Sequence, residues 1–452
     1  MKVAKFGGSS VASAEQLKKV ANIIQGDKQR KAIVVSAPGK RFSEDIKVTD
    51  LLIDLGQAYQ DSQNYQQELD AVLTRFRSIV EQLKLSTDVL TEIESDVKDI
   101  IQSDYTIELK LEAIKAVGED SLAKVLSLYL QSLGMNATYL NPQEAGIIVS
   151  DQPGSAQILE ESFDKLYQLR NREEIVVIPG FFGYTKEGKL VTFSRGGSDI
   201  TGSIVAAGAQ AELYENFTDV DSVYCVNPQI VDNPKEITSL TYKEMRELSY
   251  AGFSVFHAEA LIPAFKAKIP VCIKNTNNPD GLGTIIVSRK EVRGNPVVGI
   301  ASDAGFLSLY VSKYLMNREI GFGRRLLNIL EDEGISYEHT PSGIDDLSVI
   351  IRESQLTPEK EETIINRIKN ELQPDAVYTE RGLALIMIVG EEMHSYIGTA
   401  ARATKALEDA EVNIEMINQG SSEVSLMFGV KAEGVNRAVQ SLYRAFFETE
   451  LW

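Results

Sequence analysis

Two short segments combine glycines, hydroxyls and a cation in a way that suits phosphate binding. Residues 5–10 read Lys-Phe-Gly-Gly-Ser-Ser, and residues 194–199 read Ser-Arg-Gly-Gly-Ser-Asp. Each precedes a stretch with helical spacing, predicted over residues 12–24 and 200–211. Glycine lets the backbone approach an anion closely, and a helix N-terminus presents free N–H groups. Either segment alone is explained equally well as a tight turn, with Asp199 as a helix cap.

The two segments together predict a positively charged pocket. The chain carries a formal net charge of −19, so Lys5 and Arg195 beside two helix starts would be a local exception. Phosphoryl transfer to a carboxylate needs such a pocket, because donor and acceptor are both anions. A carboxylate is already ionised at neutral pH and needs no base. The presence of only three histidines is therefore compatible with this chemistry, and His257 is interpreted as structural.

A third polar segment follows a predicted strand. Residues 218–224 read Thr-Asp-Val-Asp-Ser-Val-Tyr, directly after the apolar run that begins at residue 213. Polar side chains at a strand end of an open α/β sheet are well placed to contact a ribose, a base or a metal. The alternative is a solvated turn rich in aspartate.

The elements that must position these segments alternate between strands and helices. Helical spacing of apolar residues covers 69–83 and 122–133, and residues 55–115 read as a long helical insertion. Several strand candidates are continuous apolar runs, as in a parallel sheet that is buried on both faces. This alternation predicts an α/β sandwich. The strand candidates are residues 3–6, 32–36, 175–179, 213–218 and 269–274.

The last third of the chain contains an internal repeat. Residues 307–380 and 384–452 align without gaps at an offset of 77. Each copy reads strand, helix, strand, strand, helix, which is the ferredoxin-like pattern, and tandem copies of so small a module usually pair their sheets. Such modules often bind ligands or form dimer contacts, although fold alone does not decide this.

Composition excludes several classes of function. The 452 residues, 43 % of them hydrophobic, suffice for two or three packed domains. The acidic balance disfavours nucleic-acid binding. The start of the chain shows no signal pattern and no apolar run approaches the roughly 20 residues of a membrane span, so a cytoplasmic protein without a membrane partner is expected. Two cysteines, Cys225 and Cys272, support neither a disulfide framework nor a zinc site, and no metal-ligating residue is predicted.

Taken together, these motifs resemble those of the aspartate kinases in the amino-acid kinase superfamily, over nearly the whole chain. Residues 274–279, Lys-Asn-Thr-Asn-Asn-Pro, resemble the segment that closes the kinase domain of that family. The resemblance implies a three-layer α/β kinase domain over residues 1–295, with the insertion at about 55–115. It also implies two ferredoxin-like ACT domains, over residues 296–380 and 381–452.

The resemblance further implies ATP and L-aspartate as substrates, 4-phospho-L-aspartate as product, and Mg²⁺ bridging the ATP phosphates. This is the first step toward lysine, threonine and methionine. Lys5 and Asp199 would be catalytic, with Lys5 between the phosphates and the substrate carboxylate. Glu119 would hold the α-ammonium and Arg195 the α-carboxylate. The other implied contacts are Ser36, Thr49 and Ser198 for aspartate, and Gly7, Gly8, Ser9, Thr218, Asp219 and Tyr224 for the nucleotide.

An amino-acid effector, lysine or threonine, is expected to bind the first ACT copy, where a helix predicted to start near residue 321 faces a predicted strand over residues 335–338. The second copy is expected to serve contacts in a homodimer or higher homo-oligomer. The effector residues implied by the resemblance, with the loop residue Asp345 added for its charge, are Met316, Phe322, Ser336, Tyr337, Glu338, Ser342 and Asp345.

The sequence departs from the family pattern on the nucleotide side. Ser194 replaces a glycine, and Gln229 and Ser254 stand where the family carries cations. These changes indicate either a subgroup with substituted nucleotide contacts or a weakened kinase. Two other readings stay open: a relative that phosphorylates uridylate, glutamate or carbamate, and a non-catalytic amino-acid sensor.

Overall fold

The computed structural model describes residues 1–62, 64–194, 196–253, 258–290, 294–420 and 424–448. The chain forms two compact units. The first comprises Met1–Val223, Glu236–Tyr242 and Val255–Lys290. The second comprises Tyr224–Lys235, Lys243–Ser254 and Glu291–Trp452. Among the described residues, no helix is both long enough and apolar enough to cross a membrane.

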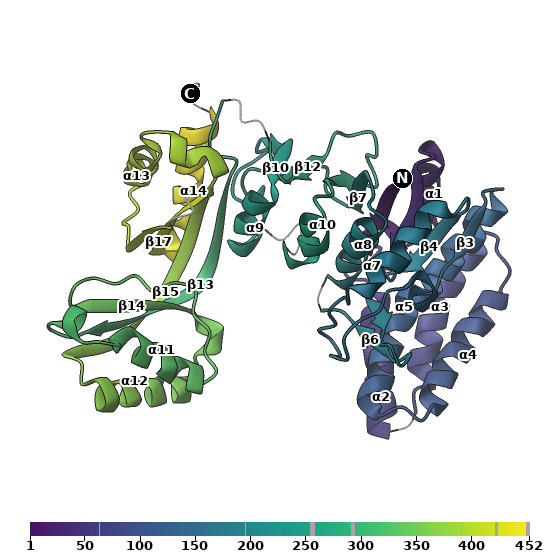
Figure 1. The fold of residues 1–452 in the computed structure, drawn as a ribbon, viewed down its shortest axis with the longest axis horizontal. Coiled ribbons are helices and arrows are strands. Elements are labelled where there is room, and N and C mark those ends of the chain that lie inside the picture. The colour runs from purple at the N-terminus through teal and green to yellow at the C-terminus, as the bar shows by residue number, and fades with distance from the viewer. Residues whose placement is uncertain (63, 195, 254–257, 291–293, 421–423, 449–452) are drawn as a thin grey trace. The chain divides into compact units, whose positions relative to one another are not determined.

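The first unit is built on an eight-stranded sheet (Figure 1). Its neighbouring strands pair in parallel, except that β11 and β12 are antiparallel. The five predicted strands are confirmed as β1, β2, β4, β7 and β11. In spatial order the strands are β10 (Ser239–Thr241), β12 (Thr284–Val287), β11 (Val271–Asn275), β7 (Leu213–Thr218), β1 (Lys2–Phe6), β2 (Arg30–Val35), β4 (Ile175–Pro179) and β3 (Ala137–Tyr139). The short strands β5 (Phe182–Tyr184), β6 (Leu190–Thr192), β8 (Val223–Tyr224) and β9 (Glu236–Ile237) lie outside this sheet.

Helices cover the sheet and supply the N-termini that the site needs. The helix α8 packs against β1, β2 and β7. The first predicted helix begins at Ala14 rather than residue 12, because Ser13 caps it and the 3₁₀ turn η1 (Ser9–Val11) precedes it. The helices of this unit are α1 (Ala14–Gly26), α2 (Val48–Ser62), α3 (Gln66–Gln82), α4 (Asp88–Gln102), α5 (Ile107–Ser132), α6 (Pro142–Ala145), α7 (Glu161–Tyr167), α8 (Gly197–Gly208) and α10 (Ile262–Lys266).

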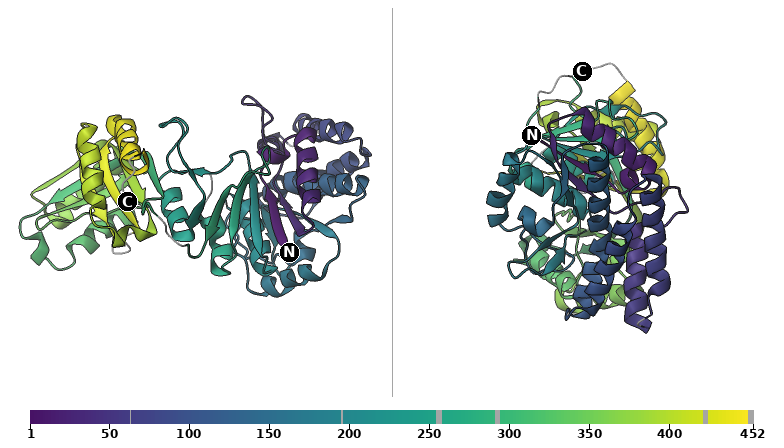
Figure 2. Two further views of the ribbon diagram at one scale, coloured as in Figure 1. Left: turned by 90° about the horizontal axis from the view of Figure 1, so that it is seen from above. Right: turned by 90° about the vertical axis from the view of Figure 1, so that its right-hand side faces the viewer.

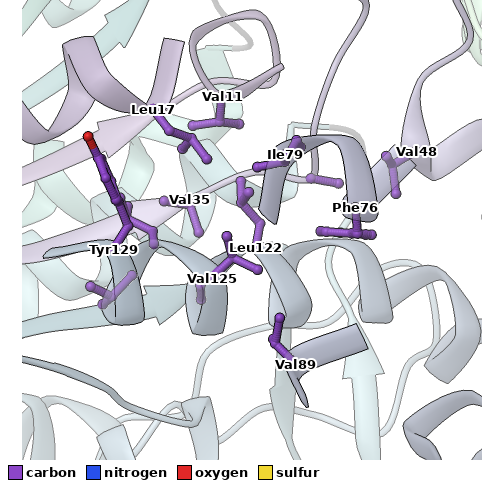
Figure 3. Close-up of a cluster of buried hydrophobic side chains, with 14 of the residues drawn as sticks. Val11, Leu17, Val35, Val48, Phe76, Ile79, Val89, Leu122, Val125 and Tyr129 are labelled. Carbon is purple, nitrogen blue, oxygen red and sulfur yellow. The ribbon is translucent and has the colours of Figure 1, made fainter. Parts of the chain in front are cut away.

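The predicted helical insertion is part of the core of this unit. The helices α2 to α5 pack against one another, as Figure 1 and Figure 2 show. Phe76, Ile79 and Val89 from the insertion join Val35 of β2 and Leu17 of α1 in one buried cluster (Figure 3). Burial of such apolar side chains contributes about 1.5–3 kcal/mol each. The insertion therefore holds the elements that border the site, rather than forming a separate body.

The second unit contains a five-stranded antiparallel sheet that both repeat copies share. The 77-residue register is confirmed, since β13 and β15, α11 and α13, and the starts of α12 and α14 differ by that number. The strand order is β14 (Asp346–Arg352), β13 (Gly299–Ser312), β15 (Ala376–Val389), β17 (Ser425–Lys431) and β16 (Met416–Gln419). The helices are α9 (Tyr242–Tyr250, apart from its first residue), α11 (Phe322–Asp332), α12 (Pro358–Leu372), α13 (Thr399–Asp409) and α14 (Val435–Tyr443).

Two predictions about this unit differ from the structure. Residues 335–338 were predicted as a strand, but they form none; an isolated bridge joins His339 to Ile350 instead. The N–H and hydroxyl of Ser336 donate to the side chain of Gln355 rather than to a strand, and only from Glu338 on does the backbone bond to Ile350 of β14. The predicted limit between residues 380 and 381 falls inside β15, and the domain limits stay a prediction.

Candidate active site

A cavity of about 550 Å³ lies at the carboxyl ends of β1 and β2 and the N-terminus of α8. Ligands of open α/β sheets bind outside the carboxyl ends of the strands, so this is the expected place. The cavity brings together eight of the predicted site residues: Gly8, Ser9, Ser36, Thr49, Glu119, Ser198, Asp199 and Asp219. Its other lining residues are Ala37, Pro38, Gly39, Lys40, Lys47, Phe181, Gly196 and Gly197.

An ion pair joins Lys5 to Asp199, which lines the cavity. Lys5 is buried, with 6 % of its surface exposed, and its Nζ contacts Oδ1 of Asp199. The same oxygen accepts a hydrogen bond of 2.8 Å from Nδ2 of Asn216 on β7. Since β1 and β7 are neighbours, strand register alone places Lys5 beside Asn216. The pair fixes the Lys5 ammonium in a place from which it can reach a bound anion.

Asp199 lies near the N-cap of its helix, as the sequence predicts, but it is not the cap itself. The helix α8 begins at Gly197, three residues before the predicted start, and its N-cap is Gly196 in the left-handed conformation with φ 80°. Glycine adopts this conformation without the penalty that a side chain brings. Asp199 lies in the first turn, where the helix dipole favours a carboxylate, and its side chain is free to pair with Lys5.

Glu119 of α5 lines the cavity as a buried acid. Only 6 % of its surface is exposed, and within the described part of the chain its Oε2 atom has no hydrogen-bond partner. Burial raises the pKa of Glu119 to about 8, although Lys5, Ser198 and the backbone of Ala37 act in the opposite direction. A carboxyl group with this pKa is largely protonated at neutral pH and would ionise when a cation binds next to it.

Glycines allow close backbone packing beside the cavity. The backbone N–H of Gly39 donates to the carbonyl of Gly8 at 2.8 Å. A Cβ atom on Gly39 would lie 2.6 Å from the carbonyl carbon of Gly8, and one on Gly180 would lie 2.7 Å from Cβ of Ser198. A side chain at either position would force neighbouring backbone apart. Gly7 lies beside Lys5, since a Cβ atom there would be 3.4 Å from the ammonium.

The predicted nucleotide segment divides into residues with different environments. Asp219 lines the cavity and accepts a hydrogen bond of 3.2 Å from the Thr218 hydroxyl. Asp221 instead accepts hydrogen bonds of 3.0 Å from the amides of Asn275 and Asn278, which ties the loop to the end of β11. Tyr224 belongs to the second compact unit. Arg195 and Ser254 lie outside the described residues.

Sequence reasoning missed Lys40 and Lys47, which line the cavity from the segment between β2 and α2. The available signal was the run Ala-Pro-Gly-Lys at residues 37–40, a glycine and a cation directly after a buried strand. Among the described residues, no group of three or more His, Cys, Asp or Glu side chains is arranged to hold a metal ion. Cys225 and Cys272 are free and buried.

The predicted effector residues fall into two groups in the second unit. Met316 and Phe322 belong to one buried cluster, and Asp345 accepts a hydrogen bond of 2.8 Å from the N–H of Leu315. Ser336 bonds to Gln355, while Glu338 accepts a hydrogen bond from Tyr250 and pairs with Arg352 at 3.4 Å. Tyr337 is 48 % exposed, and Ser342 bridges to Leu347.

Comparison with known proteins agrees with the fold and the cavity. Residues 1–275 match the model of the amino acid kinase family, and residues 386–446 match a model of the ACT domain. The cavity and every strand of the eight-stranded sheet except β12 lie in the first match, and the second covers β16, β17 and the end of β15 in the shared antiparallel sheet. Fold and site thus define an enzyme of the amino acid kinase class with ACT-type domains at its C-terminal end.

Proteins that are similar over nearly the whole chain define the enzyme class more closely. Aspartokinase 3 of Bacillus subtilis (strain 168) is 57 % identical over 448 residues, which cover 99 % of both chains. The crystal structure of Clostridium acetobutylicum aspartate kinase matches with a TM-score of 0.89 and 38 % identity, covering 99 % of this chain and 100 % of that one. That of E. coli aspartokinase III, at 24 % identity and a TM-score of 0.77, shares the fold. The chain belongs to the amino acid kinase family and, within it, is an aspartate kinase.

Proposed function

We propose that the cavity at β1, β2 and α8 transfers the γ-phosphoryl group of ATP to the side-chain carboxylate of L-aspartate. A carboxylate oxygen attacks the γ-phosphorus, the bond from that phosphorus to the β–γ bridging oxygen breaks, and 4-phospho-L-aspartate and ADP result. The observation that carries the proposal is that Glu119 and Asp199 line one cavity, while the buried ammonium of Lys5 pairs with Asp199 and acts on Glu119.

We assign a residue of opposite charge to each charged group of the substrate. Glu119 is proposed to take the α-ammonium, because it is the buried acid of the cavity and has an unpartnered oxygen. Lys5 would stabilise the charge of the transferring group, held in place by Asp199. Arg195 is proposed, from the sequence, to bind the α-carboxylate. Ser36, Thr49 and Ser198 would complete the aspartate pocket, and Gly7, Gly8, Ser9, Thr218, Asp219 and Tyr224 the nucleotide site.

Catalysis by this set needs positioning and charge, without a general base. The nucleophile is ionised at neutral pH, so the work lies in offsetting repulsion between two anions. Asp199 and Asp219 both line the cavity, and one or two carboxylates together with ATP phosphates are the usual ligands of Mg²⁺. These residues fit a nucleotide-bound Mg²⁺, which would neutralise phosphate charge.

A substrate comparison tests the proposal. ADP release should be measured with ATP and each of aspartate, glutamate and uridylate as acceptor. We expect turnover with aspartate and at most a few per cent of that rate with the others, because the pocket must match both the ammonium and the chain length. Turnover with uridylate alone would identify a different member of the family. Absence of turnover with any acceptor would favour a non-catalytic sensor.

Regulation by an amino acid, lysine or threonine, is proposed for the second unit. The support is the paired ACT-type sheet and the likeness to the Clostridium protein, which is described as an allosteric enzyme. A role at the start of lysine, threonine and methionine synthesis follows from the proposed product. The homodimer or higher oligomer and the cytoplasmic location stay predictions; size-exclusion chromatography with light scattering and cell fractionation would test them.

A further inference from the structure

The segment between β2 and α2 borders the cavity at both of its ends. Ser36 and Lys40 line the cavity where the segment begins, and Lys47 and Thr49 line it where the segment returns to α2. The residues between the two lysines do not line the cavity, and Phe42 is 58 % exposed and Ile46 50 % exposed. The segment therefore contributes one lysine to the cavity from each of its two arms.

A buried arginine of the insertion holds this segment in shape. Arg75 of α3 is 5 % exposed and donates to the carbonyl of Gly39 at 2.6 Å and to that of Ala12 at 3.1 Å. It also pairs with Asp45 at 3.0 Å. Asp45 in turn accepts three hydrogen bonds from Arg41, of 2.8–2.9 Å. These contacts hold the carbonyl of Gly39, next to Lys40, and the side chain of Asp45, two residues before Lys47, while both lysine side chains are exposed.

Lys40 and Lys47 are the cations that line this otherwise acidic cavity in the described part of the chain. Apart from these two lysines, the ionisable residues that line the cavity in the described chain are all acids: Glu119, Asp199 and Asp219. Lys5 is already paired with Asp199. Lys40 Nζ donates to the carbonyl of Ser43 at 3.1 Å, and within the described residues the Lys47 ammonium has no ion-pair or hydrogen-bond partner. Both side chains are therefore available to an anion.

The buried and the exposed charged residues of the site suit different substrates. Glu119 lines the cavity as a buried residue, and Lys5, which pairs with Asp199, is buried as well. Lys40 and Lys47 line the same cavity but are exposed, so they suit a ligand that extends toward solvent. Gly39, next to Lys40, packs on Gly8 of the glycine segment that suits phosphate.

We propose that Lys40 and Lys47 bind the phosphate chain of the nucleotide, clamping it from both arms of the segment that Arg75 holds. This rests on the proposed kinase function of the same cavity. It predicts that these lysines act on ATP affinity and leave aspartate affinity and the transfer step nearly unchanged.

The test compares Lys40→Met, Lys47→Met and the double variant with wild type and with Lys18→Met, an exposed lysine of α1 used as control. In the double variant KM for ATP and Kd for ADP by calorimetry should rise roughly tenfold or more, as expected for the loss of charge-assisted contacts. KM for aspartate should change less than twofold. The variant with arginine at both positions should retain most of the affinity, and the salt dependence of KM for ATP should flatten in the methionine variant.

Other outcomes overturn the inference. An unchanged KM for ATP in the double variant, with wild type active, would show that the lysines do not contact the nucleotide. A rise in KM for aspartate alone would assign them to the other substrate. Inactive wild-type enzyme would refute the kinase proposal itself, and ADP calorimetry would still report on the two lysines. Circular dichroism and thermal melting check that each variant folds.

Discussion

Glu119 is a residue whose chemistry depends on its surroundings rather than on its type. Its folded pKa of about 8 means that it is mostly protonated at pH 7 in the free enzyme. An ammonium group bound beside Oε2 would stabilise the ionised form, so aspartate binding should expel a proton. The affinity for aspartate should then rise with pH between about 6 and 8, by up to about tenfold per unit.

Calorimetry of aspartate binding at pH 7, in buffers of different ionisation enthalpy, measures this proton. We expect release of close to one proton by wild type and of none by Glu119→Gln, which should also bind aspartate more weakly. Equal proton release by both proteins would contradict the assignment of the ammonium to Glu119.

The proposed role of Lys5 in catalysis depends on its pairing with Asp199. Lys5→Ala should lower kcat on the order of 10²-fold or more, because the ammonium acts on charge that develops during transfer. Asp199 keeps its 2.8 Å hydrogen bond from Asn216, so the cavity should persist. Steady-state kinetics at saturating ATP and aspartate provide the measurement, and near wild-type kcat would remove Lys5 from the mechanism. Lys5→Ala combined with Asp199→Asn controls for the carboxylate left unpaired.

At the scale of elements, α3 and the segment after β2 act together. Arg75 joins two backbone carbonyls and Asp45, a geometry that the single ammonium of lysine does not reproduce. Arg75→Lys should cost roughly 1.5–3 kcal/mol of unfolding free energy, measured by urea denaturation, and should raise KM for ATP. Arg77→Lys, an exposed neighbour on the same helix, should change neither quantity. A loss of stability in Arg75→Lys without any change in KM for ATP would show that Arg75 does not influence nucleotide binding.

At the scale of the whole molecule, α9 belongs to the kinase family match but packs in the regulatory unit. Within that unit Glu247 accepts a hydrogen bond of 2.9 Å from Ser425, and Glu244 accepts one of 2.9 Å from the N–H of Glu391. Tyr250 donates to Glu338, one of the predicted effector residues. A ligand ammonium at Glu338 would compete for the same carboxylate, so α9 is placed to respond to the effector.

Effector binding should therefore be coupled to substrate binding. Saturating ATP and aspartate are expected to weaken lysine or threonine binding by about 5- to 150-fold, the range of about 1–3 kcal/mol that is usual for allosteric coupling. Glu338→Gln should reduce effector affinity, and Glu362→Gln on α12 is the exposed control. Calorimetric titrations and inhibition curves provide the measurements. No heat, no inhibition and no difference between the proteins would refute the regulatory proposal and leave the kinase assignment untouched.

Features that depend on a local pattern could be predicted from the amino-acid sequence. Apolar runs between glycine-rich junctions located β1, β2, β4, β7 and β11, and the 77-residue register located the paired elements of the second sheet. The motifs at residues 5–10 and 194–199 predicted two segments that contribute lining residues to the cavity. A glycine between a cation and a helix start is a pattern of only a few consecutive residues, so it can be recognised in the sequence.

Features that depend on contacts between residues distant in sequence could not be predicted in this way. The pairing of Asp199 with Lys5, the burial that moves the pKa of Glu119, and the convergence of Lys40 and Lys47 on one cavity all join separate elements. Residues 335–338 likewise form no strand, and the N–H of Ser336 donates to the side chain of Gln355, 19 residues away. Electrostatics and ladder pairing act through space, so their outcome is set by what the fold brings near and by how much water it excludes.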